Sequence, residues 1–440
     1  MSTLKLALVG LGSRLGVMAM SVLNVAVLAR YLEPRGRGEY FFFLTVVSVL
    51  TVLSDGGLSQ SVNVFAGRNE QWVPRIHEIM VKVLVIQYLL CLLVGMLVIQ
   101  LVGDAFFPNF GKSYRWLAAL ILPMALYANL WNSLMIGAGQ IWKMNLVQLI
   151  MSMIYLLSTI LLVLNLGLNV VQAVMVYAGM LVVQSVIMML LAPCIFAQTR
   201  ANDFPSGLAK EIVHFALRGY AGSVSTLLWS RIPVFLLNAL HGPLAVGIFS
   251  VAQQLVEKLL VPLQAVQDAI FRKTAVRSHE AAIQATNRCM RFGACCMFAV
   301  VLVGSIIAPR IISLFFGSAY AASVSVFRVL LVGTGFMGLP MILVPYLLSQ
   351  RGLPGSLSIL AIINALVCFL LGCIFIPRWG GVGAALAIVA TQALGTVIVM
   401  ILYLRLAGTR LVDTIFLTRE DIATVLEQLN GALWAKKLKV

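Results

Sequence analysis

Long apolar runs recur from one end of the 440-residue chain to the other. About 20 helical residues are needed to cross a hydrocarbon core about 30 Å thick, and the backbone hydrogen bonds must close within each crossing segment. The sequence is 61% hydrophobic and only 10% charged, whereas soluble domains contain about 25% charged residues. A water-soluble fold cannot bury this much apolar surface. We therefore expect an all-α integral membrane protein.

The apolar runs divide into twelve candidate transmembrane helices. These candidate spans are residues 5–31, 39–66, 76–102, 115–137, 144–165, 170–193, 211–239, 244–271, 289–316, 324–349, 356–376 and 382–404. The first run is expected to be retained, because it is too long for a signal peptide and no small-x-small cleavage site follows it. The pattern predicts an N-terminal six-helix bundle, a linker, a C-terminal six-helix bundle and a tail, which are residues 1–198, 199–210, 211–405 and 406–440.

The tail has the pattern of an interfacial amphipathic helix. Thr418 is a candidate N-cap, with Asp421 three residues later. Apolar residues then recur at helical spacing, and the last residues are rich in lysine, which suits anionic lipid headgroups. The pattern favours a helix that anchors the tail over one that regulates the protein.

The distribution of Lys and Arg predicts the orientation in the membrane. If the N-terminus is cytoplasmic, most of the Lys and Arg outside the spans also lie on the cytoplasmic face, as the positive-inside rule requires. Both termini are then cytoplasmic. The first loop, RYLEPRGRGEY at residues 30–40, is periplasmic although it contains three arginines. Two interpretations of Arg30 and Arg37 stay open: local pairing or headgroup contact, and contact with a ligand that leaves on the periplasmic side.

The two halves of the chain are related by a weak internal repeat. Residues 28–41 align with residues 236–249, and each segment contains a span end, a turn with Gly and Pro, and a Gly-x-aromatic start. Arg14 then falls opposite Gly222, one helical turn from Arg218. Internal repeats are common in secondary transporters, which hold the substrate near the bilayer midplane where the repeats meet.

Several charged residues fall inside the candidate spans, where charge is costly and usually faces a cavity or a partner. The basic ones are Arg14, Arg218, Arg231 and Lys258, and the acidic ones are Asp55, Glu257 and Asp268. Because guanidinium groups pair with phosphate oxygens, the basic set predicts a cationic cavity for an anionic ligand. The acidic set consists of candidates for coupling to an H⁺ or Na⁺ gradient or for structural ion pairs, such as Arg14–Asp55. The alternative is that all seven charges are paired and structural.

Other function classes find little support in the sequence. The net charge of +16 is spread over short loops and the tail, which favours topology signals and lipid contact over nucleic-acid binding. We find no Walker A motif, no catalytic Ser/His/Asp pattern and no cluster with metal-ligand spacing. We therefore expect a transporter rather than an enzyme, with no cofactor and no bound metal.

Four stretches carry a resemblance to a known family. They are residues 13–60, 246–275, 313–333 and 349–387, which include SVLNVAVLARYLEPRGRGEYFFF, VAQQLVEKLLVPLQAVQDAIF, SLFFGSAYAASVSVFR and IPRWGGVGAALA. In this order they resemble the Wzx-type polysaccharide or O-antigen flippases, which belong to the polysaccharide transporter family of the multidrug/oligosaccharidyl-lipid/polysaccharide (MOP) exporter superfamily. The resemblance implies a MATE-like MOP fold with twelve helices in two six-helix bundles.

The resemblance also implies a function. Such a flippase would move an undecaprenyl-diphosphate-linked oligosaccharide, a repeat unit of O-antigen, capsule or exopolysaccharide, across the bacterial inner membrane by alternating access. Membrane lipids, a polysaccharide polymerase and a chain-length regulator are the partners that it implies. The alternative is a MATE-like drug or metabolite antiporter coupled to H⁺ or Na⁺, which the surplus of arginine disfavours. A third hypothesis is a scaffold that does not transport.

Overall fold

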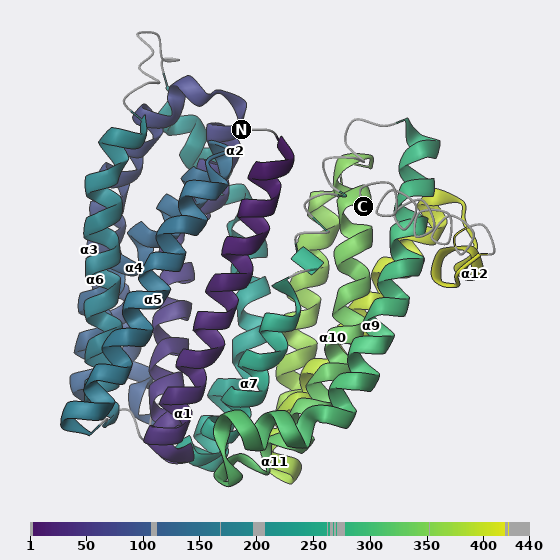
Figure 1. Ribbon diagram of the computed structural model, residues 1–440. Helices are drawn as coiled ribbons and strands as arrows, with labels where there is room; N and C mark the ends of the chain where they lie inside the picture. The colour runs from purple at the N-terminus through teal and green to yellow at the C-terminus, as the bar shows by residue number, and fades with distance from the viewer. Residues whose placement is uncertain are drawn as a thin grey trace, which may run out of the picture. The chain divides into compact units, whose positions relative to one another are not determined.

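The computed structural model describes residues 3–106, 112–167, 169–196, 207–261, 278–351 and 353–418, together with residues 263, 264, 267, 270 and 421. Every regular element in these ranges is helical (Figure 1). The elements are α1 (Thr3–Asp55), α2 (Leu58–Arg68), η1 (Glu70–Trp72), α3 (Val73–Phe106), α4 (Lys112–Gly137), α5 (Ile141–Leu166), α6 (Val170–Phe196), α7 (Leu208–Leu259), α9 (His279–Phe316), η3 (Ser318–Tyr320), α10 (Ser323–Ser349), α11 (Pro354–Ala407) and α12 (Leu411–Ile415). The expected all-α class is confirmed for the described ranges.

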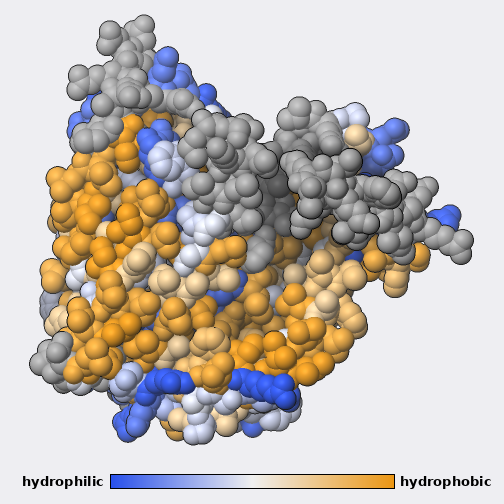
Figure 2. All heavy atoms as spheres, viewed as in Figure 1, coloured by the Kyte–Doolittle hydropathy of each residue, from blue (hydrophilic) through white to orange (hydrophobic). Residues whose placement is uncertain are grey.

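Eight helices of the described part are long and apolar enough to cross a membrane. Large hydrophobic side chains are exposed along α5 and α6, among them Leu157, Leu164 and Leu190. Figure 2 shows apolar side chains over most of the visible face of the helices on its left side. Such a surface is suited to contact with lipid chains. The number of twelve spans, the orientation with both termini in the cytoplasm and the domain boundaries stay predictions.

Three helices are much longer than a bilayer is thick. A continuous helix of the 53 residues of α1 would be about 80 Å long at 1.5 Å per residue. Each of these helices instead contains one residue with non-helical dihedral angles. That residue is Glu33 (φ 56°) in α1, Gly242 (φ 74°) in α7 and Gly380 (φ 53°) in α11. In Figure 1, α1 runs from the N-terminus to the lower edge and α2 lies near the upper edge again. Each of the three helices therefore covers two predicted spans, with the break in the predicted turn.

The second predicted span is itself interrupted. It was expected to be one helix over residues 39–66, but Gly56 and Gly57 both have positive φ and separate α1 from α2. A Cβ at Gly57 would lie 2.3 Å from the carbonyl oxygen of Ala216. Glycine is therefore required here both by the left-handed backbone and by the close approach of α7.

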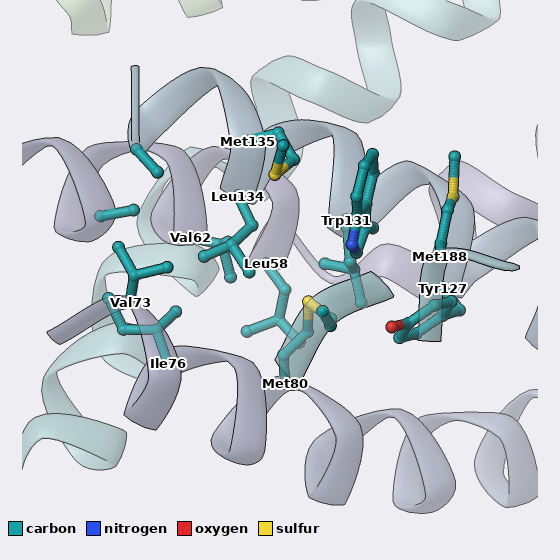
Figure 3. Close-up of a cluster of buried hydrophobic side chains, with 14 of the residues drawn as sticks. Leu58, Val62, Val73, Ile76, Met80, Tyr127, Trp131, Leu134, Met135 and Met188 are labelled. Atoms are coloured by element: carbon teal, nitrogen blue, oxygen red, sulfur yellow. The ribbon is translucent and has the colours of Figure 1, made fainter. Parts of the chain in front are cut away.

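The chain forms two compact units. The first consists of Met1–Leu255, Pro309–Val326 and Ser358–Ala387, and the second of Val256–Ala308, Phe327–Leu357 and Ile388–Val440. In the first unit, a buried cluster joins α2, α3, α4 and α6 around Trp131, which is fully buried (Figure 3). Leu58, Ile76 and Met188 point into the same cluster, and α7 adds Ile212. These contacts fix the N-terminal helices around a common core.

A close helix crossing in the first unit corrects the predicted register of the internal repeat. A Cβ at Gly38 would lie 1.7 Å from the carbonyl oxygen of Pro243, and a Cβ at Gly247 would lie 1.7 Å from that of Pro34. The crossing therefore pairs Pro34 with Pro243 and Gly38 with Gly247, whereas the predicted alignment placed Pro34 opposite Gly242. The alignment was wrong by one residue, because the two helices break at residues of different type, Glu33 and Gly242, that each precede a proline.

The new register changes the argument about the arginines. Arg14 now corresponds to Ser223, which is five residues from Arg218. Five residues correspond to about 140° around a helix with 3.6 residues per turn. The inference that both halves carry an arginine on the same face of their first helix was therefore wrong.

In the second unit, polar contacts join α9 to the end of α11 and to the tail. The Tyr403 hydroxyl donates to Asn287 Oδ1 at 2.7 Å, and Tyr403 packs edge-on against Tyr346. Arg291 of α9 forms an ion pair with Asp421 at 2.6 Å. The Thr418 hydroxyl and the Thr418 N–H both donate to Asp421, whose own N–H donates to Thr418 Oγ1 at 3.3 Å. The predicted cap is confirmed, and the helix predicted after it lies outside the described residues.

Candidate functional site

Asp55 is held by the start of α2. Its side chain is 4% exposed, and both carboxylate oxygens lie 3.2 Å from the backbone N–H of Ser59, which donates to them. Asn129 of α4 donates to the Ser59 hydroxyl at 3.2 Å, and Gln87 of α3 donates to the Asp55 carbonyl at 2.9 Å. A carboxylate at a helix N-terminus is favoured by the helix dipole and by the free N–H groups there. Asp55 thus stabilises the break at Gly56–Gly57.

The predicted basic residues lie on α1 and on both sides of the break in α7. Arg14 is half-buried on α1, and the ion pairs of the described residues do not include one between it and Asp55. Arg218 is exposed and Arg231 is half-buried, both before Gly242 of α7. These three arginines belong to the first unit.

Two further predicted charges belong to the second unit. Glu257 and Lys258 lie in the last turn of α7, and both are half-buried. Asp268 lies outside the described residues. The binding and coupling roles of the seven charges stay predictions.

Arg30 caps the end of another helix. Its Nε donates to the carbonyl oxygen of Phe315 at 3.0 Å, and its Nη2 donates to that of Leu314. Both carbonyls belong to the last turn of α9, where a cation is favoured by the helix dipole. The arginine of this loop that pairs with a nearby glutamate is Arg35. Its Nε lies 3.7 Å from Oε1 of Glu39.

Arg37 is buried, which neither interpretation of the first loop anticipated. It is 1% exposed, and its Nη2 donates to Gln254 Oε1 at 3.1 Å. Its guanidinium lies 5.3 Å from the centre of the Tyr40 ring. Its Nε and Nη1 have no hydrogen-bond partner among the described residues. In this conformation Arg37 cannot contact lipid headgroups, and its role at a periplasmic exit stays a prediction.

A cavity of about 250 Å³ lies among α1, α5 and α6, and sequence reasoning did not find it. It is lined by Val17, Gln148, Met151, Ser152, Tyr155, Tyr177, Met180, Leu181 and Gln184. The lining residues of α5 and of α6 each recur at spacings of three and four residues, which places them on one face of each helix. Single glutamines in apolar helices are a weak sequence signal, so only the packing of three helices reveals the cavity.

The comparisons with known proteins decide the family. The sequence pattern of the family described as "Polysaccharide biosynthesis protein" matches residues 4–271, which is more than half of the chain. The chain belongs to this polysaccharide biosynthesis family. No curated protein matches the chain.

Solved structures show the fold of this family member. An inward-facing multidrug resistance transporter of the MATE family superposes with a TM-score of 0.69 at 17% identity and covers 91% of this chain and 98% of its own. The lipid II flippase MurJ in an inward closed conformation gives 0.66 at 12% identity, with coverages of 94% and 89%. A MOP superfamily transporter from Pyrococcus furiosus gives 0.65 at 18% identity, with coverages of 91% and 95%. The predicted resemblance is confirmed at this level: the chain is a multi-span membrane protein with the MOP transporter fold.

Proposed function

We propose that this member of the polysaccharide biosynthesis family is a flippase for a lipid-linked oligosaccharide. Its substrate is a repeat unit of O-antigen, capsule or exopolysaccharide on undecaprenyl diphosphate. It moves the substrate from the cytoplasmic to the periplasmic leaflet of the bacterial inner membrane by alternating access. The resemblance to Wzx-type flippases over residues 13–60, 246–275, 313–333 and 349–387 supports this substrate class.

The observation that carries the proposal is that three arginines lie within the long apolar helices of the first unit. Arg14, Arg218 and Arg231 lie a turn or more from the ends of their helices. Charge inside a membrane protein persists where it has a function or a partner. A diphosphate with several acceptor oxygens is a suitable partner for guanidinium groups, and a cationic drug is not.

The substrate has three parts with different needs. The diphosphate is too costly to move bare through hydrocarbon, so it requires cationic groups within the protein. The sugars require water or polar side chains. The polyprenyl chain is apolar and can stay in the bilayer throughout. The flippase therefore has to provide a polar path for the head of the lipid only. Energy for directional transport would come from an H⁺ or Na⁺ gradient, with Asp55 and Glu257 as candidate coupling residues.

Export in living cells tests the proposal. A bacterial strain that lacks the gene should lose its surface polysaccharide and regain it with the wild-type gene. Arg14→Gln and Arg218→Gln should reduce the polysaccharide at least about tenfold, which corresponds to 1.4 kcal/mol or more in substrate binding. Arg310→Gln is the matched control, because Arg310 is exposed near the end of α9 and belongs to no predicted site. Protein levels are measured for every variant.

The outcome also separates the alternatives. Unchanged surface polysaccharide in the deletion strain, together with altered drug sensitivity, would favour a drug or metabolite antiporter. Loss of polysaccharide in the deletion strain and full export by both arginine variants would favour a scaffold without a transport site. Either result would refute the proposal.

A further inference from the structure

The cavity among α1, α5 and α6 lies at the middle of the membrane-spanning helices. Ser152 is at the centre of the span Ile141–Leu164, and Leu181 is at the centre of the span Val170–Ala192. Val17 is near the middle of the part of α1 that precedes the break at Glu33. The cavity is thus placed near the bilayer midplane, where secondary transporters hold their substrates.

The cavity faces the interior of the first unit rather than lipid. On α5 the lining residues include Gln148, Ser152 and Tyr155, whereas Met153 and Leu157 are exposed. At 100° per residue, the two sets lie on opposite sides of the helix. On α6 the same opposition holds between the lining residues 177, 180, 181 and 184 and the exposed apolar residues 175, 182, 183 and 186.

The chemistry of the lining restricts the ligand. Five of the nine lining residues are polar, and they are Gln148, Ser152, Tyr155, Tyr177 and Gln184. Polar groups at this depth are costly unless something satisfies them, so an acyl chain is a poor occupant. None of the nine carries a full charge, so the site has no ionised group for a cation or an anion. The ligand that fits is neutral, with hydrogen-bonding groups around an apolar ring.

Three of the polar side chains still have bonding capacity. Gln184 and the Tyr177 hydroxyl have no hydrogen-bond partner within the described ranges of the chain. Tyr155 pairs with the Tyr40 hydroxyl, and the Gln148 amide donates to Asn132 at 3.3 Å, which leaves Gln148 Oε1 as an acceptor. Aromatic faces, amides and a hydroxyl together match the mixed surface of a sugar ring. Van der Waals contact with Val17, Met151 and Leu181 would complete the enclosure.

We infer that this cavity holds one uncharged sugar ring of the translocated lipid, a subsite that rests on the proposed flippase function. A cavity of about 150 Å³ holds one benzene ring, so about 250 Å³ suffices for one hexose with its hydroxyl groups but not for two. Arg14 lies one helical turn before Val17 on α1, which is about 5 Å along the axis. The sugar in the cavity is therefore the one attached to the diphosphate, and the remaining sugars lie outside it.

Lipid binding to the purified full-length protein in nanodiscs tests the subsite. The probes are a polyprenyl diphosphate that carries one neutral hexose, the same polyprenyl diphosphate without sugar, and free hexose. Wild-type protein should bind the glycosylated lipid about tenfold more tightly than the bare lipid, which is 1.4 kcal/mol. Free hexose should show no saturable binding at the concentrations that saturate the glycosylated lipid, because it lacks the diphosphate.

Gln184→Leu is the deciding variant. Gln184 has no bond to another described residue, so its replacement should leave the fold intact, and bare-lipid affinity serves as the internal check. The variant should bind both lipids with the affinity of the bare lipid. Ser152→Ala should lose part of the discrimination, and Ser158→Ala on the same helix, which does not line the cavity, should keep all of it.

Two results would overturn the inference and leave the flippase proposal intact. One is equal affinity of wild-type protein for the two lipids, and the other is full discrimination by Gln184→Leu. Saturable binding of free hexose by wild-type protein would also overturn it, because the cavity would then serve a soluble sugar. Failure of wild-type protein to bind even the bare lipid would instead refute the proposed function together with the subsite.

Discussion

The crossing of α1 and α7 at Gly38 and Gly247 gives the sharpest stability prediction. An added methyl group at Gly38 would lie 1.7 Å from the carbonyl oxygen of Pro243, whereas carbon and carbonyl oxygen normally stay at least about 3.3 Å apart. The obstacle is backbone, so no side-chain rotation relieves it. Gly38→Ala therefore has to move the two helices apart by about 1.5 Å, and overpacking of this kind costs about 3 kcal/mol or more.

Thermal unfolding of the purified protein in detergent measures this cost. A loss of about 3 kcal/mol should lower the Tm by about 3 °C in a protein of 440 residues. Gly247→Ala should cause a similar fall, because its added Cβ would meet the carbonyl oxygen of Pro34 at the same 1.7 Å. Gly179→Ala is the control, because nothing lies within 4 Å of a Cβ there. A Tm for Gly38→Ala that equals the Tm of Gly179→Ala would refute the close crossing and the repeat register derived from it.

Three further predictions concern buried charges. Burial raises the pKa of the Asp421 carboxyl, but hydrogen bonds from Arg291 and Thr418 outweigh burial and lower the pKa to about 2. Docking of the tail should therefore be stable above about pH 5 and weaken as the pH falls toward about 2. Proteolysis of the tail by an acid-active protease measures this change. Arg291→Gln should expose the tail at neutral pH, and a tail that stays protected would contradict the role of this pair. Asp55→Ala should destabilise α2 by about 1–2 kcal/mol, whereas Asp55→Asn should cost less, because asparagine also caps helices; equal losses of Tm would argue against capping. Arg37→Met should leave the Tm unchanged or raise it, because two guanidinium nitrogens lack partners among the described residues and apolar replacement of buried ionic groups is often neutral or stabilising. A large fall would show that the contacts of Arg37 outweigh the cost of its burial.

The positions of the helices were largely predictable from sequence, because lipid imposes a simple rule. A span needs a long apolar run, and polar or Gly/Pro residues separate such runs near residues 33, 242 and 380. The structure breaks its long helices at these same places. The cap of Thr418 and Asp421 was predictable for a similar reason, because it depends only on residues three apart. Such features are local and need no knowledge of tertiary packing.

The environment of single charged residues could not be predicted. Arg37 lies in a loop sequence with two glutamates, yet it is buried next to Gln254, which is more than two hundred residues away in the chain. One of the two predictions for Asp55 paired it with Arg14, but its carboxylate accepts from the backbone N–H of Ser59, which the break at Gly56–Gly57 makes available. The repeat register failed because the sequence alignment matched residue types, whereas the structure matches the two prolines that start a helix. In each case the deciding partner is set by packing.

Translocation by the purified wild-type protein tests the central claim most directly. Proteoliposomes would contain a fluorescent polyprenyl-diphosphate oligosaccharide in both leaflets, and an impermeant quencher added outside would report the fraction that reaches the outer leaflet. The flippase proposal predicts that the wild-type protein makes the protected inner-leaflet lipid accessible to the quencher in at least one condition: no gradient, an H⁺ gradient or a Na⁺ gradient. If the protected fraction stays equal to that of protein-free liposomes under every gradient, the proposal is wrong.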